Sequence, residues 1–280
     1  MKFIPVTVVA CVLALSAACS RDPDEATRAP PPNGTPGTAN TSPVDAPQRE
    51  IEATRDEATA APLQETAHDY VARRPERESL AAGEIASDAI GAIPMCSVCH
   101  GPAGEGNHDL GAPRIGGLAE WYLARQLKYF RHGLRAATDE DAHGTQMRAI
   151  VLMLDGERVI EDLAAYLSAL SPPPAPAIMG GDAAHGRELY AVCMACHGAD
   201  GRGSVGLNTP SLPEQDGEYL VRQIENFRTG LRGGHPSDVF GQQMRPIVTA
   251  TIMSRSDAVD VAAYIATLRG TPSAEQARAR

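Results

Sequence analysis

The clearest pattern in the sequence is a stripe of apolar residues with the spacing of one helix face, and it occurs twice. The first stripe is Leu123, Leu127, Phe130 and Leu134, and the second, 97 residues later, is Leu220, Ile224, Phe227 and Leu231. Positions i, i+4, i+7 and i+11 fall on the same side of an α-helix. Gly133 and Gly230 lie where these helices are expected to end. The pattern predicts one amphipathic helix in each half of the chain.

A second pair of apolar stripes predicts a further helix in each half. Its members are Leu163, Tyr166, Leu167 and Leu170, matched by Val261, Tyr264, Ile265 and Leu268. Strand patterns are nearly absent, so the predicted fold class is all-α. Aromatic residues make up only 4% of the chain. This is little for two domains, and it suggests that something other than aromatic side chains fills their cores.

These stripes belong to an internal repeat with an offset of 97 residues. The triplet Gln-Met-Arg at 146–148 recurs at 243–245. Farther along, the match continues with an offset of 98, so one residue is added between Arg245 and Asp260. Two copies of one fold are therefore predicted. The stretch SPPPAPA at 171–177 between them reads as a stiff, polyproline-like connector of about 3.1 Å per residue.

The composition along the chain sets the expected boundaries. A signal peptide is expected at 1–18, a flexible acidic and Pro-rich tether at 19–82, and the first domain at 83–170. A Pro-rich linker is expected at 171–179, the second domain at 180–270 and a C-terminal tail at 271–280.

The first residues have the features of an export signal. Lys2 precedes an apolar run that is too short for a membrane-spanning helix, and Ser16-Ala17-Ala18 forms a small-residue cleavage site. The sequence LSAAC resembles a bacterial lipobox, although Ser16 occupies the place usually held by Leu. Cys19 would then be the lipidated first residue, and lipidation would remove an odd thiol from an oxidising compartment. The alternative is a secreted form with a free Cys19 thiol.

The net charge of −10 comes mostly from the segment before the repeats. From Cys19 to Ala89 the chain carries seven Arg and 14 Asp or Glu. No basic patch indicates binding to nucleic acid.

Both repeats contain the motif CxxCH, as CSVCHGPAGEG at 96–106 and CMACHGADGRG at 193–203. This motif is the attachment signature of a c-type haem. The thiols that would form thioethers with the porphyrin vinyl groups are Cys96, Cys99, Cys193 and Cys196. His100 and His197 would be the proximal iron ligands. Two covalently bound haem c groups are therefore expected.

Two other interpretations of the cysteine pairs are weaker. Four cysteines can hold zinc, but a histidine follows each pair and the pairs lie in separate repeats. A disulfide within each CxxC would suit a thioredoxin-like enzyme, but the βαβ pattern of that class is lacking.

The sixth iron ligand is predicted from the repeat itself. Met147 and Met244 each lie 47 residues after the proximal histidine, inside the matched triplets. A thioether is a soft, neutral ligand that raises the reduction potential. Met153 and Met253 do not superpose under either offset, and they fit better as core-filling residues.

Four repeated arginines are candidates to neutralise haem propionates, because a guanidinium matches carboxylate geometry. They are Arg125, Arg135, Arg222 and Arg232. For each one alone, a solvated helix face is the favoured interpretation.

Each repeat resembles a class I cytochrome c domain. The shared features, in chain order, are CxxCHG, a Gly-containing loop, Pro113 or Pro210, a YLxxQLxxFxxGxR helix, a Met and an LAAYL helix. Two in tandem resemble the dihaem cytochrome c₄ type, over about residues 83–270. The resemblance implies small all-α domains in the periplasm, with Pro113 and Pro210 orienting the proximal histidines through their carbonyls. It implies redox protein partners, such as a cytochrome bc complex or dehydrogenase as electron donor and a terminal oxidase as acceptor.

Two stretches depart from this family pattern. Pro94 lies where the first helix is expected to end. The stretches ATDEDAHGT at 137–145 and GGHPSDVFG at 233–241 are long, and they are expected to be loops that serve a partner.

An electron carrier of a respiratory chain, anchored to a bacterial membrane through Cys19, is the favoured function, because a six-coordinate iron has no open site for a substrate. The alternatives are a dihaem enzyme and a cytochrome subunit of a larger dehydrogenase or oxidase complex. A peroxidase would leave one iron open, and a thiosulfate-oxidising enzyme would use a cysteine ligand that these domains lack.

Overall fold

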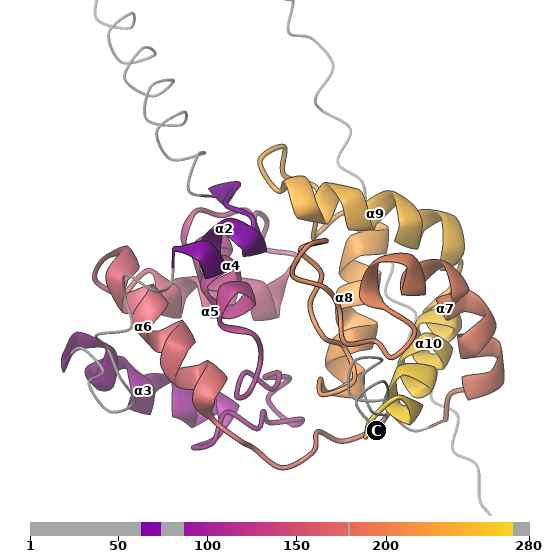
Figure 1. The fold of residues 1–280 in the computed structure, drawn as a ribbon, viewed down its shortest axis with the longest axis horizontal. Coiled ribbons are helices and arrows are strands. Elements are labelled where there is room, and N and C mark those ends of the chain that lie inside the picture. Colours follow the sequence, from indigo (N-terminus) through magenta and orange to yellow (C-terminus); the bar gives the residue numbers. More distant parts are fainter. Residues whose placement is uncertain (1–62, 74–86, 179, 271–280) are drawn as a thin grey trace, which may run out of the picture. The chain divides into compact units, whose positions relative to one another are not determined.

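The computed structural model describes residues 63–73, 87–178 and 180–270, and within these ranges the fold is all-α, with only two isolated β-bridges. The helices are α2 (Ala67–Ala72), α3 (Ser87–His100), α4 (Glu120–Arg131), α5 (Ala142–Val151), α6 (Gly156–Ala169), α7 (Ala183–His197), α8 (Gly217–Thr229), α9 (Val239–Thr251) and α10 (Arg255–Thr267) (Figure 1). The predicted signal peptide, Cys19, most of the tether and the tail lie outside the described residues. Among the described helices, none has the length and apolar character needed to cross a bilayer.

The repeat predicted from the sequence is present as two sets of four helices, α3–α6 and α7–α10. The predicted stripes lie on α4 and α8, and on α6 and α10, and most of their residues are buried. Gly230 caps α8 in the left-handed region, at φ +86°, as its position predicted. The extra residue of the second repeat lies between Val248 and Ile252, where α9 continues beyond the position at which α5 ends.

The stretches expected to be loops are non-helical over 137–141 and 233–238, and a helix begins within the last few residues of each. Helices α5 and α9 begin within them and carry Met147 and Met244. Each helix starts at a buried aspartate whose side chain accepts a backbone hydrogen bond. Asp141 accepts from Gly144 N at 3.0 Å, and Asp238 accepts from Gly241 N at 2.8 Å. Such N-caps stabilise a helix by about 1 kcal/mol.

The prediction that Pro94 ends the first helix was wrong. Helix α3 continues through Pro94 to His100. A proline inside a helix removes one hydrogen bond to the carbonyl four residues earlier, and here that residue is Ile90, which is exposed. Ala89 and Ala92 are buried in the first core. Burial of this face keeps the backbone helical despite the missing bond.

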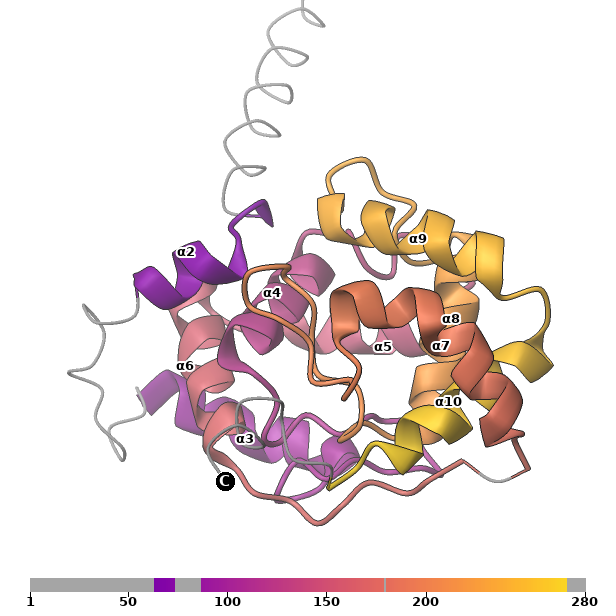
Figure 2. The same ribbon diagram turned by 45° about the vertical axis from the view of Figure 1, so that its right-hand side comes forward.

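Helices α7 and α10 cross in close contact at Gly186 (Figure 2). A Cβ at this position would collide with the backbone carbonyl of Asp260. Next to the crossing, His185 Nδ1 lies 2.9 Å from Asp260 Oδ2. Tyr190 on α7 is fully buried and stacks at a tilt on Tyr264 of α10. The small residue and these contacts fix α7, and therefore the second CxxCH motif, against the core.

The connector between the repeats is fixed by hydrogen bonds from both repeats. Residues 171–178 contain no helix, as expected for a Pro-rich connector. Arg114 of the first repeat donates to Pro173 O at 2.9 Å. Arg269 of the second repeat donates to the carbonyls of Ala175 and Pro176. One arginine from each side therefore fixes the connector.

Residues 63–73 differ from the flexible tether expected over 19–82. They form a 3₁₀ turn and then α2, whose N-terminus is closed by a capping box between Thr66 and Asp69. Ala67 and Tyr70 are buried in a cluster with residues of α4 and α6. This part of the predicted tether is therefore ordered.

Substitution of Gly186 by Ala should destabilise the second domain by about 1–3 kcal/mol, because an added methyl group forces α7 away from α10. Urea unfolding of the haem-loaded protein measures this loss. Gly91 in α3 is the matched control, since no atom lies within 4 Å of a Cβ built there. Gly91→Ala should stabilise the protein by roughly 0.5–1 kcal/mol. Equal effects of the two substitutions would contradict the close crossing.

Candidate haem-binding sites

Each CxxCH motif forms the last turn of a helix. His100 ends α3 and His197 ends α7, and their side chains are only 7% and 6% exposed. The next residues, Gly101 and Gly198, have φ values near +80° and turn the chain away. A Cys-x-x-Cys-His sequence on one turn and a half of helix presents both thiols and the imidazole toward one side. The helix therefore delivers three reactive groups to one place.

A proline carbonyl fixes the orientation of each histidine. His100 Nδ1 lies 2.7 Å from Pro113 O, and His197 Nδ1 lies 3.1 Å from Pro210 O. Because a carbonyl only accepts, Nδ1 carries the proton and Nε2 keeps its lone pair. Burial lowers the pKa of both histidines, more than the carbonyl raises it. Both rings are therefore neutral at pH 7 and present Nε2 as a metal donor.

The loop between histidine and proline is built alike in both repeats. Gly106 N donates to His100 O and Gly203 N donates to His197 O, both at 2.8 Å. An isolated β-bridge follows, Asn107–Ala112 in the first repeat and Ser204–Thr209 in the second, directly before the proline. Gly203 has φ +72°, and a Cβ there would collide with Thr209 O. This closed loop returns the proline carbonyl to the imidazole.

Each motif opens onto an internal cavity that also contains the predicted methionine. The first cavity, of about 440 Å³, is lined by Cys96, Cys99, His100 and Met147, and the second, of about 250 Å³, by Cys193, Cys196, His197 and Met244. The structure thus brings together, in each repeat, the four residues that the sequence singled out.

The walls of the cavities fit a porphyrin. They are mostly apolar, and in the first cavity they include Leu127, Phe130 and Leu163. The same cavity is lined by Arg222, whose buried Nε has no hydrogen-bond partner. An apolar cavity with a guanidinium whose Nε has no partner among the described residues suits a flat macrocycle with carboxylate arms. The cavities also account for the low aromatic content, because the cores are built around them.

The four repeated arginines lie between the two repeats and not on a solvated helix face, so the favoured interpretation was wrong for Arg125 and Arg135, which are buried. Arg135 donates to Gln223 Oε1 at 3.0 Å, and Arg232 donates to Gln126 Oε1 at 3.0 Å. These two bonds are related by exchange of the repeats. We call this contact the seam; in it, the arginine that follows each of the helices α4 and α8 bonds a glutamine of the other helix.

The seam is shared by both cavities. Tyr122, Gln126, Tyr219 and Gln223 line the first cavity and the second. Arg135 also donates to Tyr219 Oη at 3.4 Å, and the matching bond runs from Arg232 to Tyr122 Oη at 3.3 Å. Each cavity is therefore closed on one side by side chains of the other repeat. Sequence reasoning missed these tyrosines and glutamines, although the repeat YLxRQ pointed to them.

The competing candidates do not meet in a site. Met153 and Met253 are each 69% exposed, so their predicted role as core filler was wrong. Burial raises the pKa of the Cys193 thiol to about 11, which disfavours the thiolate that zinc needs. Within the described ranges, the one cluster with metal-ligand spacing is His185, Asp257 and Asp260, and it contains no cysteine.

Comparisons with known proteins give the family. The model of the family described as Cytochrome c matches residues 92–171 and, separately, 183–269, which together are more than half of the chain. Each match contains one CxxCH motif and its methionine. Two cytochrome c domains in tandem are therefore present.

Three relatives are similar over most of the repeat region. A protein of Thiomonas intermedia named thiosulfate dehydrogenase electron acceptor is 38% identical over 152 residues, covering 50% of this chain and 66% of its own length. One of the same name from Stutzerimonas stutzeri is 32% identical over 182 residues, covering 61% of this chain and 77% of its own length. The crystal structure of reduced cytochrome c₄ from Pseudomonas stutzeri is 26% identical, with a TM-score of 0.52, covering 66% of this chain and 98% of that one.

The two cytochrome matches, the c₄ structure and the paired cavities agree with one another. The chain belongs to the cytochrome c family and is a dihaem c-type cytochrome of the c₄ type, an electron-transfer protein with two haem c groups.

Proposed function

We propose that this protein is a periplasmic, membrane-anchored dihaem carrier that accepts electrons from a thiosulfate-oxidising dehydrogenase and delivers them to a terminal oxidase of a respiratory chain. The single observation that supports the donor is the similarity to two proteins named thiosulfate dehydrogenase electron acceptor. The chain corresponds to just under two thirds of the length of the first of these.

The proposed axial ligands are His100 with Met147 in the first domain and His197 with Met244 in the second. Two observations support this assignment. Each histidine lines the same cavity as its methionine, and the Nδ1 bond to a carbonyl leaves Nε2 of each ring as the metal donor. Haem supplies the reversible one-electron chemistry when bound. With a histidine and a methionine as ligands, the iron would have no position left for a substrate, and the site would relay electrons without binding a reactant.

The seam favours transfer between the two domains. Tyr122, Gln126, Tyr219 and Gln223 belong to both cavity walls, so the two cavities adjoin at the seam. The seam arginines add positive charge at the same place, and we assign them to the haem carboxylates. Arg222 is the clearest case, because its buried Nε has no hydrogen-bond partner among the residues that the structure describes. An electron that enters at one domain therefore has a short route to the other.

The anchor in this proposal is an acyl chain on Cys19, which follows the lipobox-like LSAA. Mass spectrometry of the mature N-terminus should find a diacylglyceryl-modified Cys19 as its first residue. Cys19→Ser should release the protein from the membrane fraction with both haem groups retained. A wild-type protein with an unmodified Cys19 would rule out the anchor and leave the carrier function intact.

Substitution of Met244 by His should leave the fold and the covalent haem in place and lower the potential of one haem. Imidazole stabilises ferric iron more than a thioether does, and axial ligands span a range of roughly 0.8 V. Spectroelectrochemical titration measures the change. Met253→His is the matched control, because Met253 is exposed and lies outside both cavity walls. Identical titrations of Met244→His and the wild type would refute the ligand assignment.

The proposed donor is tested by following the reduced haem bands in stopped flow. Thiosulfate together with a purified thiosulfate dehydrogenase should reduce both haem groups, whereas thiosulfate alone should reduce neither. Reduction by thiosulfate alone would identify an enzyme and contradict the carrier. No reduction in either mixture, with rapid reduction by a cytochrome bc complex, would replace the proposed donor and keep the carrier function.

A further inference from the structure

The two repeats face each other across the seam so that it has two matched edges. Among the described residues, a segment from outside the repeats covers one of these edges. At one edge Arg222 of the second repeat donates to Gly111 O, and at the other Arg125 of the first repeat donates to Asn208 O. Gly111 and Asn208 are equivalent positions, 97 residues apart, with φ values of +63° and +60°. Residues 63–73, which lie outside both cytochrome c matches, occupy the edge at Asn208.

The side chain of Asn208 receives this segment. Its Oδ1 accepts from Ala67 N, at the first turn of α2, at 2.5 Å, and from Arg125 Nη2 at 2.9 Å. Arg125 also donates to Glu65 O at 3.4 Å. One amide oxygen of the second domain therefore bonds both the segment and the first domain. Gly111, at the equivalent position, has no side chain with which to make these bonds.

An apolar contact beside Asn208 joins the same three parts. Leu63 of the segment is buried with Tyr129 and Leu134 of the first domain, and Phe240 of the second domain packs against them. The guanidinium of Arg125 lies 4.0 Å from the centre of the Phe240 ring. His143 occupies the position equivalent to Phe240 in the first repeat. Both residues that the second domain contributes to this edge thus differ from their counterparts.

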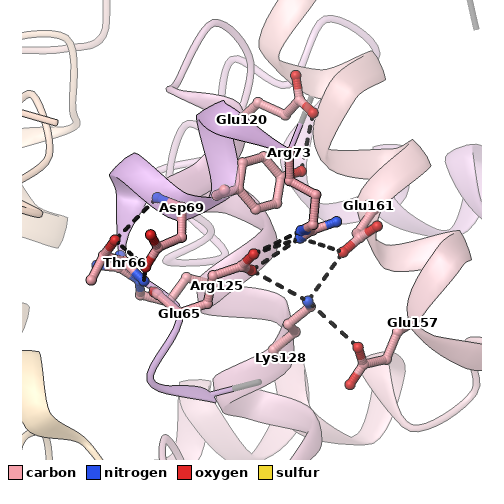
Figure 3. A network of polar contacts seen from close by, with 10 residues as sticks. Glu65, Thr66, Asp69, Arg73, Glu120, Arg125, Lys128, Glu157 and Glu161 are labelled. Atoms are coloured by element: carbon pink, nitrogen blue, oxygen red, sulfur yellow. Dashed lines mark hydrogen bonds and ion pairs between the residues drawn. The ribbon is translucent and has the colours of Figure 1, made fainter. Parts of the chain in front are cut away.

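Ion pairs attach the segment to the first domain (Figure 3). Lys128, with a side chain only 6% exposed, lies 3.2 Å from Glu161 and 4.0 Å from Glu65. Arg73 bonds Glu65 and Glu161 at 2.9 and 3.3 Å. A buried lysine needs such partners, because burial of an unpaired charge is costly. Glu157 of the first domain also lies 3.5 Å from Lys128, so Glu65 in the segment is the third and most distant of the three carboxylates that pair with this cation.

The edge at Gly111 lacks the equivalent chemistry. The residues of the first domain that contact the segment include Trp121, Lys128 and Tyr129. Their counterparts in the second domain are Glu218, Glu225 and Asn226, which are acidic or polar. A segment with the charge and apolar pattern of residues 63–73 finds no complementary surface there. The two edges match in backbone and differ in the side chains that bind.

We propose that residues 63–73 are an interdomain clamp, whose binding site is the edge formed by Asn208 and Phe240 of the second domain with Arg125 and Lys128 of the first. The clamp bonds to both haem domains at once and so holds the seam closed at this edge. Arg125 and Phe240 also line the second cavity, so the clamp packs against two residues of that cavity's wall. This inference does not depend on the identity of the electron donor.

Hydrogen–deuterium exchange on the full haem-loaded protein tests the clamp. Asn208→Gly and Phe240→His replace the two residues with their equivalents in the first domain, Gly111 and His143. Glycine adopts φ +60° without strain. In the Asn208→Gly, Phe240→His double variant, amides of residues 63–73 should exchange roughly 2- to 10-fold faster, the factor expected for loss of one hydrogen bond. Amides of the seam helices α4 and α8 should also exchange faster. His68→Ala is the matched control, since His68 is an exposed residue of the same segment.

Each result of this experiment decides the question. Faster exchange in both the segment and the seam helices, with no change in His68→Ala, supports the clamp. Unchanged exchange in residues 63–73 would show that Asn208 and Phe240 do not bind them. Faster exchange in the segment alone would show that residues 63–73 bind at this edge but do not stabilise the seam, which would contradict the clamp. Unchanged far-UV circular dichroism of the double variant confirms that the protein used is folded.

Discussion

The hydrogen bond from a histidine ring to a proline carbonyl, thirteen residues farther along in each repeat, is the interaction on which the rest of the structure depends. It selects the tautomer and the rotation of a buried imidazole in one step, because only a protonated Nδ1 can donate. In each repeat a β-bridge, between residues 107 and 112 or between 204 and 209, closes the loop and places the proline carbonyl next to the histidine ring. A ring that turned freely would bury an unpaired polar atom and lose its defined direction toward the cavity.

The seam follows from placing two such cavities next to each other. Arginine side chains buried near the cavities lose their hydration, and contact with aromatic rings offsets part of this desolvation cost. The guanidinium of Arg135 lies 4.2 Å from the ring centre of Phe130, and that of Arg232 lies 4.7 Å from Phe227. Their hydrogen bonds then cross to the other repeat. The same side chains thus bind the domains together and set the charge beside each cavity.

The sequence predicted the parts of the fold that have a long, regular pattern. Helices α4 and α8 have four apolar residues on one face and an ending glycine, so they were found. Helices α5 and α9 were missed, because a glycine lies in the first turn of each and few positions face the core. Their signal was the N-cap aspartate, at 141 and 238, three residues before a glycine.

The site was predicted more completely than the fold around it. The CxxCH residues are identified by their attachment motif and the two methionines by the repeat, without any knowledge of packing. The seam could not be predicted in the same way, since Tyr122 and Gln126 acquire their role only when the other repeat lies opposite. Residues 63–73 carry a short signal, with Leu63, Ala67 and Tyr70 at i, i+4 and i+7. Three positions in a charged, Ala-rich stretch are too few to separate a packed helix from a flexible one.

The paired bonds of Arg135 with Gln223 and of Arg232 with Gln126 have a consequence for how the molecule is assembled. Residue i contacts j while j contacts i, which is the isologous geometry of a twofold homodimer. The tandem chain is in this sense a dimer of one unit whose halves are covalently joined. The proline connector raises the effective concentration of one half near the other, while the orientation comes from the faces themselves. Joining the halves also frees each copy to change by itself, which two identical subunits cannot do.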